Sequence, residues 1–226
     1  SFFYKRIFQN IDKVFAQSQL DKSRLEELGA TNIEVIGNIK LAQLPKVNVN
    51  LEKPKQVVIT AASTHENEEK LILEAFKKER GKLIVVPRHP ERFEKVHLEI
   101  LEFIKDKNIS YERYSDKESF ESDIILVDKM GILNDIYAIS DVVILGGAFE
   151  KIGGHNPIEP AFFGCKIISG KNIFNQKSLF DCIKNYYLIE NDELGSYLDN
   201  LSNLEKPILT KAGSIEPIIK EINRWL

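Results

Sequence analysis

Short apolar runs rich in β-branched residues alternate with amphipathic segments along most of this 226-residue sequence. The clearest runs are Gln56–Ala62, Lys82–Val86 and Asp141–Leu145, and helical spacing of apolar residues follows the first two. Parallel strands need a long crossover connection, which is usually a helix. The alternation therefore predicts an α/β fold with a doubly wound parallel sheet covered by helices on both faces.

The same pattern extends over the rest of the chain. Further strands are expected at Lys13–Ala16, Ile33–Ile36, Ile124–Val127, Lys166–Ser169 and Tyr187–Ile189. Helices are expected at Gln19–Leu28, Glu68–Arg80, Phe93–Ile104, Gly131–Ile139, Gln176–Asn185, Glu193–Leu201 and Ile215–Trp225. Between them, the polar segment Leu41–Lys55 contains two prolines and little periodicity, which is typical of a linker. We place a domain boundary in it, with domains at 1–45 and 46–226.

Composition excludes several classes of protein. Hydrophobic residues make up 43% and charged residues 29% of a chain with net charge −3, so we expect a soluble globular protein and no nucleic-acid partner. Cys165 and Cys182 are expected to be reduced thiols. The sequence predicts no metal site and no cofactor, and no apolar run approaches the roughly 20 residues of a membrane span. Because the chain begins with Ser1, we expect a fragment with residues upstream.

Two strand ends carry residues suited to an anion. Thr60–Glu66 places small and hydroxyl residues before a helix, and Ser63 with Glu66 fits a capping box. Simple capping by Ser63 is the alternative interpretation of this segment. Val86–Arg92 places Arg88 and His89 between two prolines directly after a buried strand. Arg88 is suited to bidentate binding of a phosphate, unless it only pairs with Glu91 in a surface turn.

The strongest candidate is the glycine-rich segment Leu145–Pro160. Gly146 and Gly147 end a strand, and a second glycine pair precedes His155, Asn156 and Pro157. Asn156 is expected to be the N-cap of a helix with Pro157 at its first position. Glu159 would then lie in the first turn and accept hydrogen bonds from sugar hydroxyls. The four glycines would cradle a phosphate through their backbone N–H groups.

Other short motifs are weaker. Leu126–Gly131 ends a further strand, and the backbone near Met130 and Gly131 is placed to contact a base edge. Gly164–Asn172 resembles a P-loop, but its spacing is one residue too long and Asn172 stands where Ser or Thr is needed. The absence of a Gly-x-Gly-x-x-Gly motif argues against a nicotinamide site.

Together these motifs resemble the Kdo (3-deoxy-D-manno-octulosonic acid) transferases of lipopolysaccharide biosynthesis. The stretches that carry the resemblance are Val14–Ser18, Gly37–Lys40, Ala61–Glu66, Val86–Phe93 and Gly153–Ala161. The resemblance implies a GT-B glycosyltransferase with two Rossmann-like domains. Residues 1–45 would be the C-terminal end of the acceptor (N-terminal) domain, and residues 46–226 the nucleotide-sugar donor-binding domain.

The resemblance also implies roles for single residues. Arg88 would contact the donor phosphate, Glu159 the ribose hydroxyls, and the Met130–Gly131 backbone the cytosine. The remaining donor-binding residues would be Ser63, His89, Gly153, Gly154, His155 and Asn156. Asn38 and Lys40 are expected to line the cleft between the domains.

The family's reaction follows from the same resemblance. The donor would be CMP-Kdo and the acceptor a lipid A precursor, at the cytoplasmic face of the bacterial inner membrane. The family inverts the anomeric centre by using a carboxylate as general base. This base belongs to a Ser-x-Gly-Glu-type motif that the sequence does not contain, so we expect it upstream of Ser1, together with the part that touches the membrane. The fragment alone is expected to be soluble and inactive.

Two other functions remain open at this point. A UDP-sugar epimerase of the same architecture also combines glycine turns with a ribose-binding glutamate. A non-catalytic nucleotide-binding module would need the same binding residues and no base.

Overall fold

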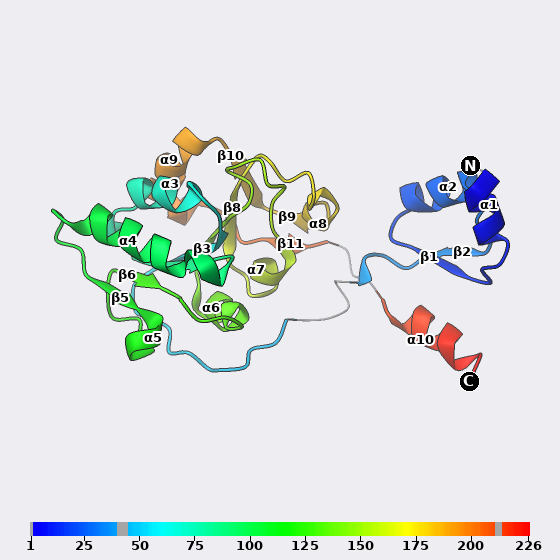
Figure 1. The fold of residues 1–226 in the computed structure, drawn as a ribbon, viewed down its shortest axis with the longest axis horizontal. Coiled ribbons are helices and arrows are strands. Elements are labelled where there is room, and N and C mark those ends of the chain that lie inside the picture. Colours follow the sequence, from blue (N-terminus) through cyan, green and yellow to red (C-terminus); the bar gives the residue numbers. More distant parts are fainter. Residues whose placement is uncertain (1, 40–44, 211–213) are drawn as a thin grey trace. The chain divides into compact units, whose positions relative to one another are not determined.

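The computed structural model describes residues 2–39, 45–210 and 214–226 (Figure 1). The chain divides into two compact units, which are Ser1–Leu44 with Thr210–Leu226, and Pro45–Leu209. No helix among the described residues is long and apolar enough to cross a membrane.

The smaller unit holds the first two strands. β1 (Val14–Ala16) and β2 (Ile33–Val35) pair in parallel, and α1 (Phe2–Phe8), α2 (Gln19–Glu27) and α10 (Glu216–Asn223) complete the unit. The Ser18 hydroxyl caps α2 by accepting a hydrogen bond from the Asp21 N–H at 3.1 Å. The Ser214 N–H donates to the Ile36 carbonyl at 3.1 Å. Residues 210–226, which the sequence placed with the second domain, therefore group with the first 44 residues.

The larger unit is built on a seven-stranded sheet in which every pair is parallel. The strand order is β10-β8-β7-β3-β4-β6-β5. The strands are β3 (Val58–Thr64), β4 (Lys82–Pro87), β5 (Tyr111–Arg113), β6 (Ile124–Leu126), β7 (Val142–Leu145), β8 (Lys166–Gly170) and β10 (Tyr186–Ile189). A separate antiparallel pair joins β9 (Ile183–Lys184) to β11 (Ile208–Leu209).

Helices cover both faces of this sheet (Figure 1). α3 (Glu68–Ala75), α4 (Phe93–Ile104) and α9 (Leu194–Asp199) pack on one face. α6 (Leu133–Ile139) packs on the other, with α5 (Tyr114–Lys117) and α7 (Ile158–Phe162) on the same side in Figure 1. α8 (Lys177–Phe180) precedes β9. The predicted doubly wound α/β fold is confirmed.

Side chains along each central strand alternate between the two faces of the sheet, so the same strands contribute to a hydrophobic cluster on each face. Leu83 and Val85 of β4 face the cluster with α3 and α4, whereas Ile84 and Val86 face the cluster with α6. Successive side chains of a strand point to opposite faces, so a strand that is apolar at every position is buried on both.

Several predicted boundaries were wrong. The helix expected at Glu68–Arg80 ends at Ala75, because Phe76 adopts an extended conformation and is followed by a short 3-10 helix at Lys78–Arg80. The helix expected at Gln176–Asn185 is α8 followed by strand β9. Other short 3-10 helices lie at Pro90–Arg92, Asn191–Glu193 and Leu201–Asn203.

The second half of the predicted linker is held against the larger unit. The Asp135 carboxylate accepts hydrogen bonds from the N–H groups of Asn48 and Val49, at 2.6 and 3.2 Å. Asp141 accepts from Lys53 at 2.6 Å and from the Val58 N–H at 2.9 Å. Asp135 in α6 and Asp141 before β7 thus fix the segment that precedes β3.

The strand order creates a switch point beside β3. From β3 the chain adds β4, β6 and β5 on one side, and it then crosses back to add β7, β8 and β10 on the other. α3 after β3 and α7 after β7 lie on opposite sides of the sheet in Figure 1, and we call the region at the carboxyl ends of these two strands the crevice. Ligands of open α/β sheets bind in such a crevice.

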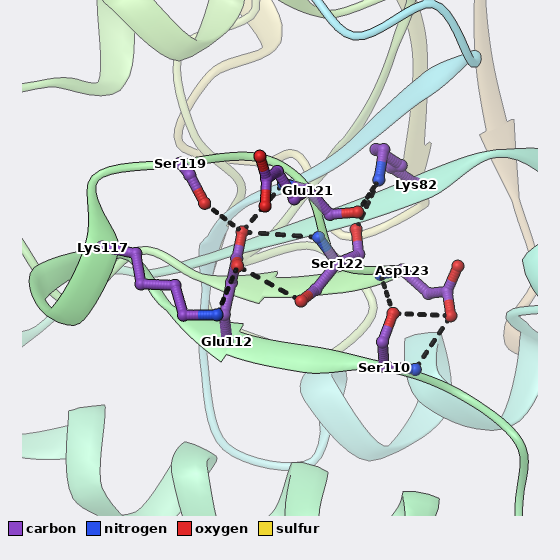
Figure 2. A network of polar contacts seen from close by, with 8 residues as sticks. All are labelled: Lys82, Ser110, Glu112, Lys117, Ser119, Glu121, Ser122 and Asp123. Atoms are coloured by element: carbon purple, nitrogen blue, oxygen red, sulfur yellow. Dashed lines mark hydrogen bonds and ion pairs between the residues drawn. The ribbon is translucent and has the colours of Figure 1, made fainter.

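A buried polar network stabilises the opposite, amino-terminal edge of the sheet (Figure 2). The Glu112 carboxylate on edge strand β5 is almost fully buried and accepts hydrogen bonds from the Ser119 and Ser122 hydroxyls and from the Glu121 and Ser122 N–H groups. The Lys82 ammonium donates to the carbonyls of Glu121 and Ser122. The network closes the loop between β5 and β6 onto the start of β4.

Replacing Glu112 tests this network. Glu112→Ala should lower the free energy of unfolding by about 1–3 kcal/mol, since it leaves buried donors without an acceptor. Chemical denaturation measures the change. Glu121→Ala is the control, because this side chain is exposed and only its backbone groups belong to the network. Equal effects of the two substitutions would contradict the role assigned to Glu112.

Candidate functional site

The end of β3 is distorted where the crevice opens. Pairing between β3 and β4 shifts register between Ala62 and Thr64, and Ser63 between them is buried with a φ of 55°. A bulge of this kind redirects the residues that follow it. The predicted capping box is wrong: Ser63 belongs to β3, α3 starts at Glu68, and Glu66 pairs with Lys95 instead.

The glycine-rich segment folds into two turns that lie against each other. A Cβ on Gly146 would meet the Ser63 carbonyl oxygen at 2.6 Å, and one on Gly147 (φ 76°) would meet His155 Cδ2 at 2.8 Å. The Gly154 N–H donates to the Gly147 carbonyl at 2.7 Å. Glycine is therefore required where the end of β7 passes the end of β3 and the His155 ring.

Three imidazoles from three strand-end loops meet at the crevice, and we call them the imidazole cluster: His65, His89 and His155. Nε2 of His65 lies 2.8 Å from Nε2 of His155, and the two rings stack at 5.1 Å between centroids. The His89 ring contacts His65 edge-on at 5.5 Å. His65 follows β3, His89 follows β4 and His155 follows β7. His89 and His155 were predicted to be site residues from the sequence. His65 was not, although it lies in the predicted anion-binding segment Thr60–Glu66.

Burial and the nearby positive groups lower the pKa of His155 and of His65. Burial, followed by the nearby charges of His65, Arg88 and His89, lowers the pKa of His155 to about 4. Burial also lowers the pKa of His65, with further contributions from His89, Arg92 and Arg88. Only one hydrogen can occupy the short His65–His155 contact, so one ring donates and the other accepts.

Arg88 adds a fixed positive charge next to the cluster. Its side chain is exposed, and its N–H donates to the Thr64 carbonyl at 3.0 Å, which holds the loop beside β3. Among the described residues its guanidinium has no ion-pair partner, and Glu91 instead lies 3.9 Å from His89. The alternative in which Arg88 pairs with Glu91 is therefore wrong, and the guanidinium is available to an anion.

The start of α7 lies beside the cluster. The Asn156 side chain accepts a hydrogen bond from the Ile158 N–H at 3.0 Å and donates to Glu159 at 3.1 Å. The prediction of Asn156 as N-cap and Pro157 as first helical residue was wrong by one position, because Pro157 is the N-cap and α7 begins at Ile158. Glu159 lies in the first turn and is half-buried.

Other predicted residues lie apart from this group. Met130 is exposed and Gly131 has a φ of 86°, in the loop between β6 and α6. No hydrogen bond or ring contact joins them to the imidazole cluster within the described part of the chain. Asn38 is buried in the smaller unit, and Lys40 lies outside the described residues, so the cleft predicted for this pair stays a prediction.

A buried carboxylate that the sequence analysis did not select reaches into the first glycine turn. Glu68, the first residue of α3, accepts hydrogen bonds from the N–H groups of His65 (2.9 Å), Gly147 (2.8 Å) and Phe149 (3.1 Å). The expectation that all four glycines offer their N–H groups to a phosphate is therefore wrong for three of them, since the Gly146 N–H pairs with the Ala62 carbonyl and the Gly154 N–H with the Gly147 carbonyl. By contrast, the N–H groups of Gly153, His155 and Asn156 have no acceptor among the described residues.

Within residues 2–39, 45–210 and 214–226, no group of three or more His, Cys, Asp or Glu side chains is arranged to hold a metal ion. Cys165 and Cys182 are buried and form no disulfide within the described residues, and burial raises the pKa of Cys165 to about 12. The groups that remain available at the crevice are a guanidinium, three imidazoles and the backbone N–H groups before α7.

Comparisons with known proteins agree on one family. Residues 1–43 match the family described as 3-deoxy-D-manno-octulosonic-acid transferase (kdotransferase). A bifunctional glycosyltransferase/methyltransferase of Fusobacterium nucleatum is 35% identical over 92% of this chain and 34% of its own length. A 3-deoxy-D-manno-octulosonic acid transferase of Aquifex aeolicus is 31% identical over 96% of this chain and 58% of its own length.

A solved structure matches at the level of a whole domain. The C-terminal CMP-Kdo binding domain of WaaA from Acinetobacter baumannii is 33% identical, with a TM-score of 0.55, and the match covers 64% of this chain and 77% of that one. The chain belongs to the Kdo transferase family. Its larger unit has the Rossmann-like fold of a GT-B C-terminal domain. The chain spans 34% and 58% of the lengths of the Fusobacterium and Aquifex relatives.

His155 makes a pH-dependent contribution to the stability of this Kdo transferase chain. Because the pKa of His155 is depressed to about 4 from an ordinary value of 6.5, the unfolded state binds the proton first as the pH falls. The free energy of unfolding should therefore decrease between about pH 6.5 and pH 4. Urea denaturation across this range should show a shallower decrease for His155→Asn. A wild-type slope in His155→Asn would contradict the assignment.

Proposed function

We propose that this chain is the donor-binding part of a Kdo glycosyltransferase of lipopolysaccharide biosynthesis, with CMP-Kdo as its donor. The observation that carries the proposal is an unpaired, exposed Arg88 beside three imidazoles at the switch point, in a domain 33% identical to a CMP-Kdo binding domain. One phosphate joins the nucleoside and the sugar in such a donor, and a single guanidinium next to free backbone N–H groups matches one phosphate.

Each predicted site residue has a place in this proposal. Arg88 binds the phosphate together with His89, His155 and the N–H groups around Gly153. The loop at Met130 and Gly131 contacts the cytosine through its backbone. Glu159, held by Asn156 in the first turn of α7, accepts hydrogen bonds from the ribose hydroxyls. Gly154 and Ser63 shape the floor of the site by their positive φ angles.

The proposed chemistry is an inverting displacement. A general base deprotonates the acceptor hydroxyl of a lipid A precursor, which attacks the anomeric carbon while the bond to the phosphate of CMP breaks. Negative charge grows on the departing phosphate during this step. Arg88 and the N-terminal end of α7 stabilise that charge, since both are aimed at the place where it develops.

The base and the acceptor are assigned to other parts of the enzyme. We place the base in the acceptor domain, of which residues 1–45 would be the C-terminal end, at the cytoplasmic face of the inner membrane. This chain alone would then bind the donor without transferring its sugar. Detectable transfer of Kdo to a lipid A precursor by this chain alone would contradict that assignment.

Nucleotide preference distinguishes the proposal from a UDP-sugar epimerase. Isothermal titration calorimetry should show CMP binding at least about tenfold tighter than UDP, a difference of about 1.4 kcal/mol. UMP is the control that separates recognition of the base from that of the phosphates. Tighter binding of UDP than of CMP would favour the epimerase.

Arg88 is the residue on which phosphate binding most depends in this proposal. Arg88→Ala should weaken CMP binding by roughly ten- to a hundredfold, the range expected for a charge-assisted hydrogen bond. The affinity for cytidine should change little, since cytidine has no phosphate. Arg24→Ala, in an exposed position on α2, is the matched control. An unchanged CMP affinity in Arg88→Ala would remove Arg88 from the site.

A further inference from the structure

The crevice contains two sets of backbone N–H groups that suit an anion. One set belongs to the turn at Gly147–Phe149, at the end of β7, and the other precedes α7 at Gly153–Asn156. Turns of this kind bind phosphates because successive N–H groups converge on one point. In the first set, the Gly147 and Phe149 N–H groups already hold an anion that the protein supplies itself. In the second set, the N–H groups of Gly153, His155 and Asn156 have no acceptor among the described residues.

That internal anion is Glu68. Its side chain is 1% exposed, with Oε2 bound to the N–H groups of His65 and Gly147 and Oε1 bound to that of Phe149. The carboxylate thus ties the loop after β3 to the loop after β7, across the switch point. A Cβ on Gly146 would approach Oε2 to 2.8 Å, so the glycine at this position also makes room for the carboxylate.

The charge of this carboxylate is compensated by backbone N–H groups alone. Its hydrogen-bond donors are backbone N–H groups, with Glu150 contributing beside His65, Gly147 and Phe149, and it forms no ion pair within the part of the chain that the structure describes. Its neighbour Glu69 differs, since that carboxylate pairs with Arg92 at 2.8 Å. A phosphoryl group near the Gly147 turn would therefore meet a negative charge, and the Gly147 and Phe149 N–H groups are already bonded to it.

We propose that Glu68 is a specificity-determining residue that limits the site to donors with one phosphate. The inference rests on the proposed function, because it assumes that the nucleotide binds in this crevice. A single phosphate binds at Arg88 and the N–H groups before α7. A second phosphate would have to occupy the turn that Glu68 already fills, and Coulomb repulsion between two anions in a partly buried crevice opposes this.

The test compares CMP with CDP by calorimetry in metal-free buffer. The wild-type chain should bind CMP at least about tenfold tighter than CDP. Glu68→Gln removes the charge while keeping the size of the side chain, and it should reduce this ratio at least about fivefold. If Glu68 has a purely structural role, Glu68→Gln would weaken the binding of CMP and CDP equally. The ratio of the two affinities would then stay unchanged, which would overturn the proposal. Glu69→Gln, a buried carboxylate on the same helix, is the control and should keep the wild-type ratio.

A second measurement does not depend on the variant being folded. In the wild-type chain, the Gly147 and Phe149 amides should exchange slowly with solvent without nucleotide, and their NMR shifts should change little when CMP is added. Fast exchange, or equal affinities for CMP and CDP, would overturn the role of Glu68. Failure of the wild-type chain to bind CMP at all, with these amides still protected, would instead contradict the proposed function.

Discussion

The position of β7 next to β3 is the constraint on which the rest of this structure depends. After β5 and β6 have extended one half of the sheet, the chain returns and pairs β7 with the free edge of β3. Because β3 and β7 are neighbours, the loop after β3 and the loop after β7 lie side by side at the carboxyl ends of the two strands. The bulge at Ser63, the glycines after β7 and the imidazole pair all lie where these two loops meet.

Much of the fold could be predicted from the sequence because long buried strands have a simple signature. β3 and β4 are apolar or small at nearly every position, and each precedes a periodic segment, so their existence and order were predicted. β5 was missed, since Tyr111–Arg113 is short and carries two charged residues. The end of α3 was misplaced for a related reason: Phe76 continues the helical spacing but packs into the core in an extended conformation.

Some residues of the candidate site could be predicted from the sequence and others could not. Arg88, His89 and His155 were found because loops after buried strands are the expected place for a ligand. Glu68 and His65 were not, since their partners lie 79 and 90 positions away in the sequence. The capping box at Ser63 and Glu66 satisfied a local rule, but the carboxylate that bonds this turn is that of Glu68, which accepts from the nearby His65 N–H and from the distant Gly147 N–H. Glu68 could be recognised in the sequence as an acidic residue at a helix start. Taken alone, this position indicates only a favourable interaction with the helix dipole.

The anchored half of the linker defines where the larger unit begins as a folding unit. Its first strand starts at Val58, yet the carboxylates of Asp135 and Asp141 are bound by backbone and side-chain groups from Asn48 onward. A truncation chosen at the edge of the sheet would expose both carboxylates and remove the donors that hold them. The ten residues before β3 therefore belong to the domain physically, although they contain neither a helix nor a strand.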